Sequence, residues 1–234
     1  MINGILPLNK PAGWTSFDAV DKVRRIARAV TGERKIKVGH SGTLDPMATG
    51  VLPIFIGKAT KTIDLLKTHD KEYVAGFKLG VKADTLDITG TVLAEQTVNI
   101  SREQLLETLA GFTGKITQLP PMYSAVKIDG KRLYDLARQG QQVERKPRGA
   151  AVYELELIDY TPEAAAGTLR VSCGKGTYIR TLIDDIGTSL NLCGGVMTSL
   201  IRTFANGINL AQCYEISDIS TDNFPPLLDP ENYI

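Results

Sequence analysis

Cysteine and histidine, which form most zinc sites, are scarce in this sequence, and cysteine is also the residue of disulfide frameworks. Among its 234 residues are three cysteines and two histidines. Cys173, Cys193 and Cys213 form no Cys-x-x-Cys pair, and His40 and His69 are far apart in the sequence. We therefore expect no metal site and no disulfide framework, and we interpret the cysteines as small buried apolar residues.

Long apolar runs are also missing. Nothing approaches the roughly 20 apolar residues of a membrane-spanning helix, and residues 1–10 lack the apolar core of a signal peptide. The Gly-Lys pairs at 57–58 and 174–175 lack the upstream glycine of an NTPase phosphate-binding loop. We expect a cytoplasmic protein with no membrane partner, and the sequence does not support an NTPase.

The net charge of only +1 conceals an uneven distribution. Residues 1–61 contain ten Lys and Arg against four Asp and Glu, and residues 115–148 contain eight against three. Residues 203–234 contain five acidic residues and no Lys or Arg. Basic segments are typical of nucleic-acid binding but also of ordinary solvated faces, so charge alone leaves both interpretations open.

Several segments have helical patterns. The first runs from about 15 to 32, where Thr15 or Ser16 caps the start, Asp18 lies in the first turn and Gly32 ends the helix. Further helices are expected over 101–111, where Ser101 begins a capping box, over about 133–138 and over about 178–190. The polar face of the first helix contains four basic residues, Lys22, Arg24, Arg25 and Arg28.

Alternation of apolar and polar residues indicates strands around 73–79, 153–157 and 169–173. In the second of these, Tyr153, Leu155 and Leu157 alternate with glutamates and are expected to share one face. The strands occur in groups, and no strict β-α-β repeat is present. This order favours an α+β domain around a mixed or antiparallel sheet.

Residues 118–148 interrupt this pattern with proline, glycine and positive charge. The segment opens with Gln118-Leu119-Pro120-Pro121 and ends in Arg145-Lys146-Pro147-Arg148. A loop of this length within a compact domain is usually functional or disordered. Its positive charge favours a flap that closes on a polyanion.

The segment 39–50 presents an acid on a loop. Gly39, Gly42 and Gly50 give the backbone freedom around Asp45, and Pro46 biases Asp45 away from helical geometry. We interpret Asp45 as a rigidly presented carboxylate and a candidate catalytic residue. An aspartate before proline is also a common start of a turn, so the loop alone leaves that alternative open.

Together these segments resemble the motifs of the TruB family, the tRNA pseudouridine-55 synthases. The similarity is collinear from about residue 4 to residue 207. It is carried by KPAGWTS at 10–16, GHSGTLDPMATGVLPIFIGKATK at 39–61, KEY at 71–73, DTLDITG at 84–90, QLPPMYSAVK at 118–127, CGKGTYIR at 173–180 and LIRT at 200–203. Ser41, Met47 and Ile201 depart mildly from the family pattern, and none of them removes a group that the chemistry needs.

The resemblance implies the pseudouridine synthase fold, an α+β fold with a mixed, mostly antiparallel central sheet flanked by helices. It implies an enzyme that isomerises uridine to pseudouridine at position 55 in the T-loop of tRNA. The implied catalytic residues are Asp45, Tyr73 and Arg180. Residues expected to contact the substrate are His40, Tyr178, Leu200 and Lys10. Residues expected to contact the RNA backbone are Arg24, Arg25, Arg28, Lys127, Lys131, Arg132, Lys146 and Arg148.

Each implied role has a plainer alternative in the residues themselves. The resemblance makes Arg180 the charge partner of Asp45, but Arg180 could form an ordinary surface ion pair. It makes Tyr73 a stacking platform for an extruded uridine, whereas alternation alone makes Tyr73 a half-buried strand residue. It has His40 fill the space that the uridine leaves, although His40 could simply order the loop. Tyr178 and Leu200 could equally belong to the core.

The resemblance also suggests how the chain is organised. We expect a catalytic domain over residues 1–210, with the basic thumb inserted at 118–148. Residues 211–234 would form a short acidic extension, too short for the PUA-type RNA-binding domain with which family members generally end. We expect a monomer.

The implied reaction breaks the N1–C1′ bond of uridine and joins C5 to C1′, without redox change or group transfer. We therefore expect no cofactor. The expected partner is the T-arm of tRNA, without a guide RNA. The alternatives are an RNA-guided pseudouridine synthase and a non-catalytic module that binds or folds tRNA.

Overall fold

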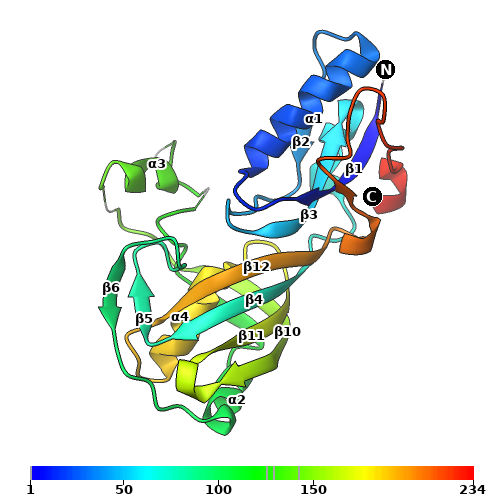
Figure 1. Cartoon of the computed structure of the whole chain (residues 1–234). Coiled ribbons are helices and arrows are strands. Elements are labelled where there is room, and N and C mark those ends of the chain that lie inside the picture. Colours follow the sequence, from blue (N-terminus) through cyan, green and yellow to red (C-terminus); the bar gives the residue numbers. More distant parts are fainter. Residues whose placement is uncertain (1, 125, 129, 142) are drawn as a thin grey trace. The chain divides into compact units, whose positions relative to one another are not determined.

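The computed structural model describes residues 2–124, 126–128, 130–141 and 143–234, without the side chains of residues 127, 128, 132 and 138. The chain forms two compact units (Figure 1). The first contains the residues up to Tyr73 and those from Leu200 onward, and the second contains Val74–Ser199. Strands β4 (Lys71–Leu79) and β12 (Gly195–Ala205) have residues in both units, so the chain passes between the units within strands.

The first unit is built on a mixed sheet. Its central strands β1 (Gly4–Lys10) and β3 (Thr49–Ile56) are antiparallel, and all of β1 pairs with residues 50–56 of β3. β14 (Tyr214–Glu215) joins β1 in parallel, and β12 joins β3 in parallel. β2 (Val38–His40) pairs with β3 and β13 (Ile208–Asn209) with β12, both antiparallel. Nearly every residue of β1 and β3 is buried, as their apolar runs require.

Helix α1 (Ser16–Thr31) packs against these strands (Figure 1). It forms where the sequence predicts it, because Thr15 and Asp18 make a capping box and Gly32 takes a left-handed conformation at the end. Ala19, Val20, Val23 and Ala27 form its buried stripe. The helix thereby holds the residues that follow β1 in a fixed place on the sheet.

The C-terminal acidic segment belongs to the first unit. Ile5, Phe55 and Ile208 form a buried apolar cluster, against which Leu228 and Tyr233 pack. Two backbone hydrogen bonds join Ile5 and Leu228. A capped turn of 3-10 helix, Pro230–Tyr233, ends the chain. Residues 211–234 are therefore packed on the sheet by their apolar side chains, whereas the boundary at residue 210 stays a prediction.

The second unit contains the remaining strands of the large sheet in the order β12, β4, β11, β10, β7. β10 (Arg148–Thr161) is antiparallel to both β11 (Ala166–Cys173) and β7 (Gly114–Gln118). Helix α4 (Ile179–Ser189) lies against this sheet, and α2 (Arg102–Ala110) packs beside α4 and β10 (Figure 1). β5 (Val81–Ala83) and β6 (Val92–Glu95) form a separate two-stranded sheet.

The basic segment 118–148 is more structured than the predicted flap. Two short strands, β8 (Lys127–Ile128) and β9 (Lys131–Arg132), form a hairpin that leads into α3 (Leu133–Arg138). Leu133 and Leu136 are buried, which gives this segment an apolar anchor. The helix predicted at 133–138 is confirmed.

The α+β class and the mixed, mostly antiparallel sheet are confirmed, as are the helices predicted near 15–32, 101–111 and 178–190. The prediction that Tyr153, Leu155 and Leu157 share one face of a strand is wrong. A register shift between Val152 and Glu154 turns Val152 inward and leaves Tyr153 half exposed. A β-bulge interrupts the two-residue alternation and thus defeats a prediction from periodicity.

Two further expectations need correction. The loop predicted over 39–50 is shorter, because Gly39 and His40 belong to β2 and Gly50 to β3. Cys173 is fully buried as predicted, but Cys193 and Cys213 are partly exposed, and no disulfide is formed among the described residues. Within the described residues, no helix is long and apolar enough to cross a membrane.

Candidate functional site

Lys10 anchors the Asp45 loop from inside the first unit. Its side chain is fully buried, and its Nζ donates hydrogen bonds to the carbonyl oxygens of Pro11 (2.8 Å), Trp14 (2.7 Å) and Pro46 (3.3 Å). The backbone N–H of Gly13 also donates to the Pro46 carbonyl at 2.8 Å. The 10–14 segment and the loop are thereby tied together one residue after Asp45.

Ser16 holds the same loop on its other side. Its Oγ donates to the Leu44 carbonyl (3.1 Å) and accepts from the Leu44 N–H (2.8 Å). Ser16 is the first residue of α1, so the start of that helix and the residue before Asp45 are fixed together. The Asp45 carbonyl then accepts from the Ala48 N–H at 3.1 Å, which closes the turn at Pro46.

Arg202 reaches the loop from β12. Its side chain is fully buried; Nε donates to the Val51 carbonyl at 2.7 Å and Nη2 to the Gly42 carbonyl at 3.1 Å. Gly50 makes this approach possible, because a Cβ there would lie 2.2 Å from the Arg202 carbonyl oxygen. Gly50 has φ +103°, a conformation that L side chains rarely adopt.

Ser41 completes the support. It is buried, and its hydroxyl donates to Oδ1 of the buried Asn206 at 2.7 Å. Asn206 in turn donates to the Thr68 carbonyl at 3.1 Å. The loop is therefore held by side chains from four separate parts of the first unit, and Asp45, which is partly exposed, is presented on a rigid support.

Two titratable groups in this region have lowered pKa values. Burial lowers the pKa of Lys10 from 10.5 to about 8, an effect that the negative charge of Asp45 opposes and the positive charge of Arg202 reinforces. Burial and the positive charge of Arg202 also lower the pKa of His40, which keeps its imidazole neutral at pH 7. His40 Nδ1 is buried without a hydrogen-bond partner among the described residues.

The structure thus brings Lys10, His40 and Asp45 together in the first unit. Lys10 was expected to contact the substrate, but its buried ammonium already binds three carbonyl oxygens, which favours a positioning role. Tyr73 lies on β4 as predicted and is buried rather than half-buried, and Leu200 on β12 is also buried. The roles of these side chains stay predictions.

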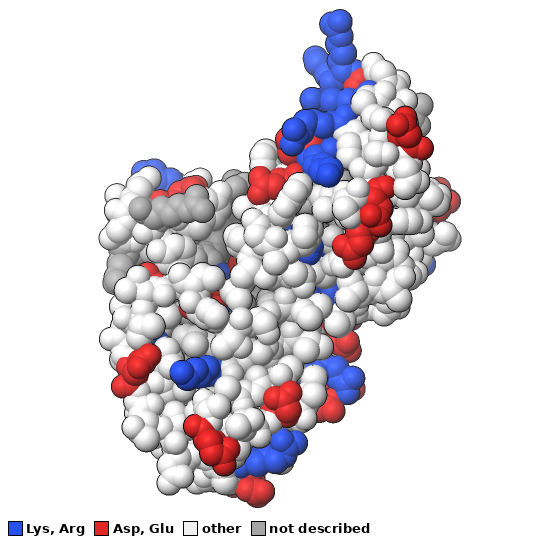
Figure 2. Space-filling model, in the orientation of Figure 1, with Lys and Arg blue, Asp and Glu red and all other residues white. Residues whose placement is uncertain are grey.

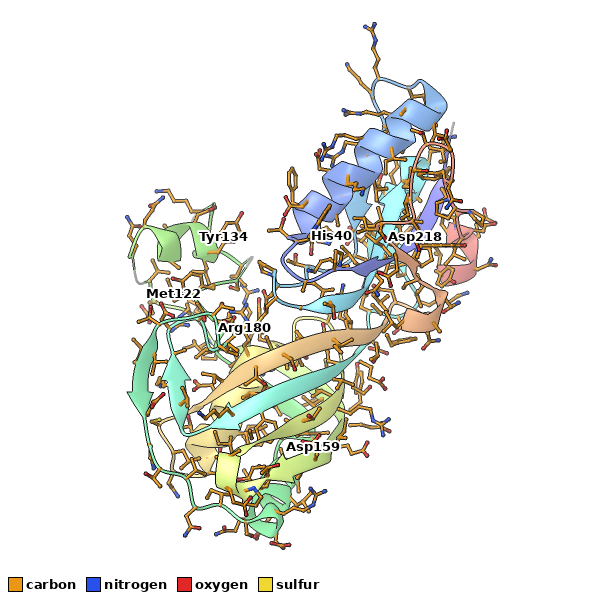
Figure 3. All side chains as sticks on the ribbon, in the orientation of Figure 1. His40, Met122, Tyr134, Asp159, Arg180 and Asp218 are labelled. Atoms are coloured by element: carbon orange, nitrogen blue, oxygen red, sulfur yellow. The ribbon has the colours of Figure 1, made fainter. Side chains whose placement is uncertain are left out.

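Arg180 belongs to the second unit, on the first turn of α4 (Figure 3). It is buried, which excludes the alternative of a surface ion pair. Its Nη1 donates to the Thr85 carbonyl and its Nη2 to the Tyr123 carbonyl, both at 2.9 Å. Its Nε lies 4.0 Å from Oδ2 of Asp87. Because Asp45 is in the other unit, the pairing of Arg180 with Asp45 stays a prediction.

Gln118 connects the base of the basic segment to α4. It is buried at the end of β7, and its side-chain amide forms two hydrogen bonds with the backbone of Tyr178, at 3.0 and 3.1 Å. Tyr178 is the residue before α4 and is partly exposed. The backbone of the predicted substrate contact Tyr178 is thus fixed from β7.

The residues predicted to contact an RNA backbone differ in availability. Arg24 donates to Asp21 (3.2 Å) and to the Val38 carbonyl (3.3 Å), and Arg25 pairs with Asp21 at 3.1 Å. Arg28, Lys131, Lys146 and Arg148 are exposed. The side chains of Lys127 and Arg132 lie outside the described residues. Arg24 is thus the least available of the described candidates.

Sequence reasoning did not assign roles to Ser16, Asn206 or Arg202, although all three hold the Asp45 loop. Ser16 and Arg202 lie in two of the motifs that carry the family resemblance, KPAGWTS and LIRT, whereas Asn206 lies in none of them. Among the described residues, no group of three or more His, Cys, Asp or Glu side chains could hold a metal ion.

The chain is similar to known proteins along nearly its whole length. The family described as TruB family pseudouridylate synthase (N terminal domain) matches residues 27–179. A tRNA pseudouridine synthase B of Dehalococcoides mccartyi (strain CBDB1) is 47% identical over 219 residues, which are 93% of this chain and 70% of the relative. One of Phocaeicola vulgatus is 45% identical over 229 residues, which are 97% of this chain and 94% of the relative.

Solved structures have the same fold. A chain in the structure of a Cbf5–Nop10–Gar1 complex superposes with a TM-score of 0.68 at 30% identity, over 92% of this chain and 53% of that one. A chain in a structure of an H/ACA RNP bound to a substrate RNA gives 0.65 at 27%, over 92% and 51%. The present chain spans about half the length of both. These similarities confirm the predicted fold, and the chain belongs to the TruB family of pseudouridylate synthases.

Proposed function

We propose that this protein isomerises uridine to pseudouridine at position 55 in the T-loop of tRNA, with Asp45 as the catalytic carboxylate. The observation that carries the proposal is the support of the Asp45 loop by Lys10, Ser16, Ser41 and Arg202. The relatives at 45–47% identity named tRNA pseudouridine synthase B support the choice of tRNA.

Asp45 acts on the reacting nucleotide. A carboxylate can attack an electrophilic carbon or stabilise the positive charge that develops there. The rigid loop contributes by fixing its direction, because a catalytic group placed in advance loses little entropy on reaching the transition state. The N1–C1′ bond breaks, the base turns, C5 bonds to C1′, and the proton of C5 is lost while N1 gains one.

The target uridine leaves its stack to reach Asp45, at a cost of a few kcal/mol. Stacking on an aromatic ring recovers about 1–3 kcal/mol, and we assign this role to Tyr73. His40 occupies the space that the uridine vacates. Its neutral imidazole suits that role, because no charge is then placed between stacked bases. Tyr178 and Leu200 form walls of the uridine site.

Arg180 supplies positive charge to Asp45 in the complex with RNA. The exposed cations Arg28, Lys131, Lys146 and Arg148 bind phosphates of the T-arm and position it without reading its bases. Affinity for RNA should then fall steeply as salt rises. A flat salt response would contradict this use of the basic residues.

Tritium release tests the proposal. Purified protein is mixed with unmodified tRNA transcript labelled at C5 of uridine, without any guide RNA. Release of tritium from the T-loop uridine is expected. Binding without release would indicate a non-catalytic RNA-binding module, and release that depends on an added guide would indicate an RNA-guided enzyme; either would overturn the proposal.

A further inference from the structure

A basic surface lies at the end of α1 and just beyond it, outside the motifs that carry the family resemblance. It consists of the exposed side chains of Arg28, Arg34, Lys35 and Lys37, which we call the distal basic patch. Figure 2 shows Lys and Arg side chains gathered where α1 ends. From residue 24 to residue 40 the sequence has six basic residues and one acid, Glu33.

The segment that carries the patch is anchored. Gly32 ends α1, the Thr31 hydroxyl accepts from the Glu33 N–H at 3.2 Å, and Ile36 is buried between two exposed basic residues. The Lys37 carbonyl accepts from the Gly57 N–H at 2.8 Å. The cations are therefore presented on a backbone with a defined path.

These cations are not used within the part of the chain that the structure describes. No hydrogen bond or ion pair is formed there by the side chains of Arg34, Lys35 and Lys37, whereas Arg24 and Arg25 both pair with Asp21. Arg28 lies in the last turn of α1, where a positive charge stabilises the helix. That explanation does not extend to the other three, which follow the helix.

The patch continues from the Asp45 site. Lys37 immediately precedes β2 and is three residues from His40, about 10 Å along an extended chain. Arg28 lies twelve residues along α1 from Ser16, which is about 18 Å along the helix axis. Such a span is that of a helical stem, not of one nucleotide.

We propose that the distal basic patch binds the phosphate backbone of the helical stem that adjoins the target loop of the RNA. This inference rests on the proposed function, because it assigns a second contact to the same substrate. The residues from 24 to 39 include no aromatic side chain on which a base could stack. Contacts of lysine and arginine with phosphates position a nucleic acid and carry no sequence information.

The test compares two triple variants of the full chain. Arg34→Gln/Lys35→Gln/Lys37→Gln removes three cations of the patch. Lys78→Gln/Arg102→Gln/Lys115→Gln removes three exposed cations of the second unit and is the matched control. Affinity for unmodified transcript is measured from 50 to 200 mM salt, together with single-turnover tritium release at saturating enzyme and thermal unfolding.

The patch variant should bind the transcript at least about tenfold more weakly at low salt, and its slope of log K against log salt should be smaller by about 2–3. Its release rate at saturation should equal that of the wild type, because Arg34, Lys35 and Lys37 are not among the residues that hold the Asp45 loop. For RNA cut back to the target loop with a short stem, the loss of affinity should shrink. The control should match the wild type throughout.

Wild-type affinity and slope in the patch variant would overturn the inference while leaving the proposed function intact. Retained RNA binding with lost binding to phosphatidylserine vesicles would also overturn it, in favour of a membrane surface. Absence of tritium release from the wild type would instead overturn the proposed function. The RNA affinities of the patch variant and the wild type would still show whether the patch binds RNA.

Discussion

Arg202 and Lys10 are fully buried cations, a rare placement for either residue unless its charge is compensated. Each directs its donors to backbone carbonyl oxygens, including those of Gly42 and Pro46 in the Asp45 loop. A buried donor group that loses its acceptors costs about 1–3 kcal/mol. The two cations thus bind the loop strongly, and replacing either one should change where Asp45 points.

Replacing Arg202 by lysine should therefore impair catalysis more than binding. One ammonium cannot donate to both Val51 and Gly42 as the guanidinium does. We expect Arg202→Lys to lower kcat at least about tenfold and the free energy of unfolding by about 1–3 kcal/mol, with RNA affinity unchanged. Single-turnover kinetics and denaturant unfolding measure both effects.

Arg170→Lys is the matched control, since Arg170 forms an exposed pair with Glu156. It should leave kcat unchanged and alter the free energy of unfolding by no more than about 0.5 kcal/mol. Wild-type kcat in Arg202→Lys would show that the guanidinium does not position the loop.

Substitutions of Tyr73 separate the contribution of its ring to RNA binding from that of its hydroxyl to the reaction. In Tyr73→Phe the stacking surface survives, so RNA affinity should stay within about twofold of the wild type, as a stacking term of 1–3 kcal/mol is retained. If a step of the reaction uses the hydroxyl, the single-turnover rate of Tyr73→Phe should be lower than that of the wild type. Tyr73→Ala should lose affinity as well. An unchanged rate in Tyr73→Phe would leave stacking as the only role of this residue.

At the scale of elements, α1 and α2 begin in the same way but differ in what they support. Thr15 with Asp18 and Ser101 with Gln104 both form complete capping boxes. Only α1 begins at a residue, Ser16, that holds the Asp45 loop. Fraying at the start of α1 should therefore affect both stability and catalysis, whereas fraying at the start of α2 should affect stability alone.

Removing each cap separates stability from activity. Thr15→Ala and Ser101→Ala should each lower the free energy of unfolding by about 1 kcal/mol. Thr15→Ala should in addition reduce kcat, because Ser16 is no longer fixed against Leu44, whereas Ser101→Ala should leave kcat unchanged. Equal kcat in the two variants would mean that the start of α1 does not contribute to the site.

The same comparison explains how much of the protein could be predicted. Caps and stripes depend on residues three or four apart, so α1 and α2 were predicted almost to their ends. The support of the Asp45 loop depends on pairs such as Ser41 with Asn206, 165 residues apart. No local pattern reports such pairs. Asp45 was assigned through its motif. Arg202 also lies in a quoted motif, LIRT, but its contact with the Asp45 loop, like that of Asn206, is seen only in the fold.

At the scale of the whole molecule, stability depends on an acidic pair on α4. Burial raises the pKa of Asp184, whose Oδ1 has no hydrogen-bond partner among the described residues. Burial and the adjacent charge of Asp184 raise the pKa of Asp185 from 3.8 to about 6. The folded protein therefore holds a proton on Asp185 that the unfolded chain releases above pH 3.8.

Stability should consequently fall as pH rises through the window from about 4 to 6 and remain lower above it. Asp185→Asn removes this cost, so the variant should be more stable than the wild type at pH 7.5 by roughly 1–3 kcal/mol. The difference should nearly vanish at pH 3, below both pKa values, where the wild-type carboxyl is mostly protonated in both states. Urea unfolding at the two pH values measures it, and a variant less stable at pH 7.5 would contradict the assignment.

We expect Asp45 to act in the chemistry and to contribute little to RNA binding. Asp45→Asn keeps the size and shape of the side chain and leaves the loop supports in place. Single-turnover tritium release from unmodified tRNA should fall by several orders of magnitude, while affinity for the same RNA stays within about threefold of the wild type. An Asp45→Asn variant that turned over tRNA at a comparable rate would contradict this expectation.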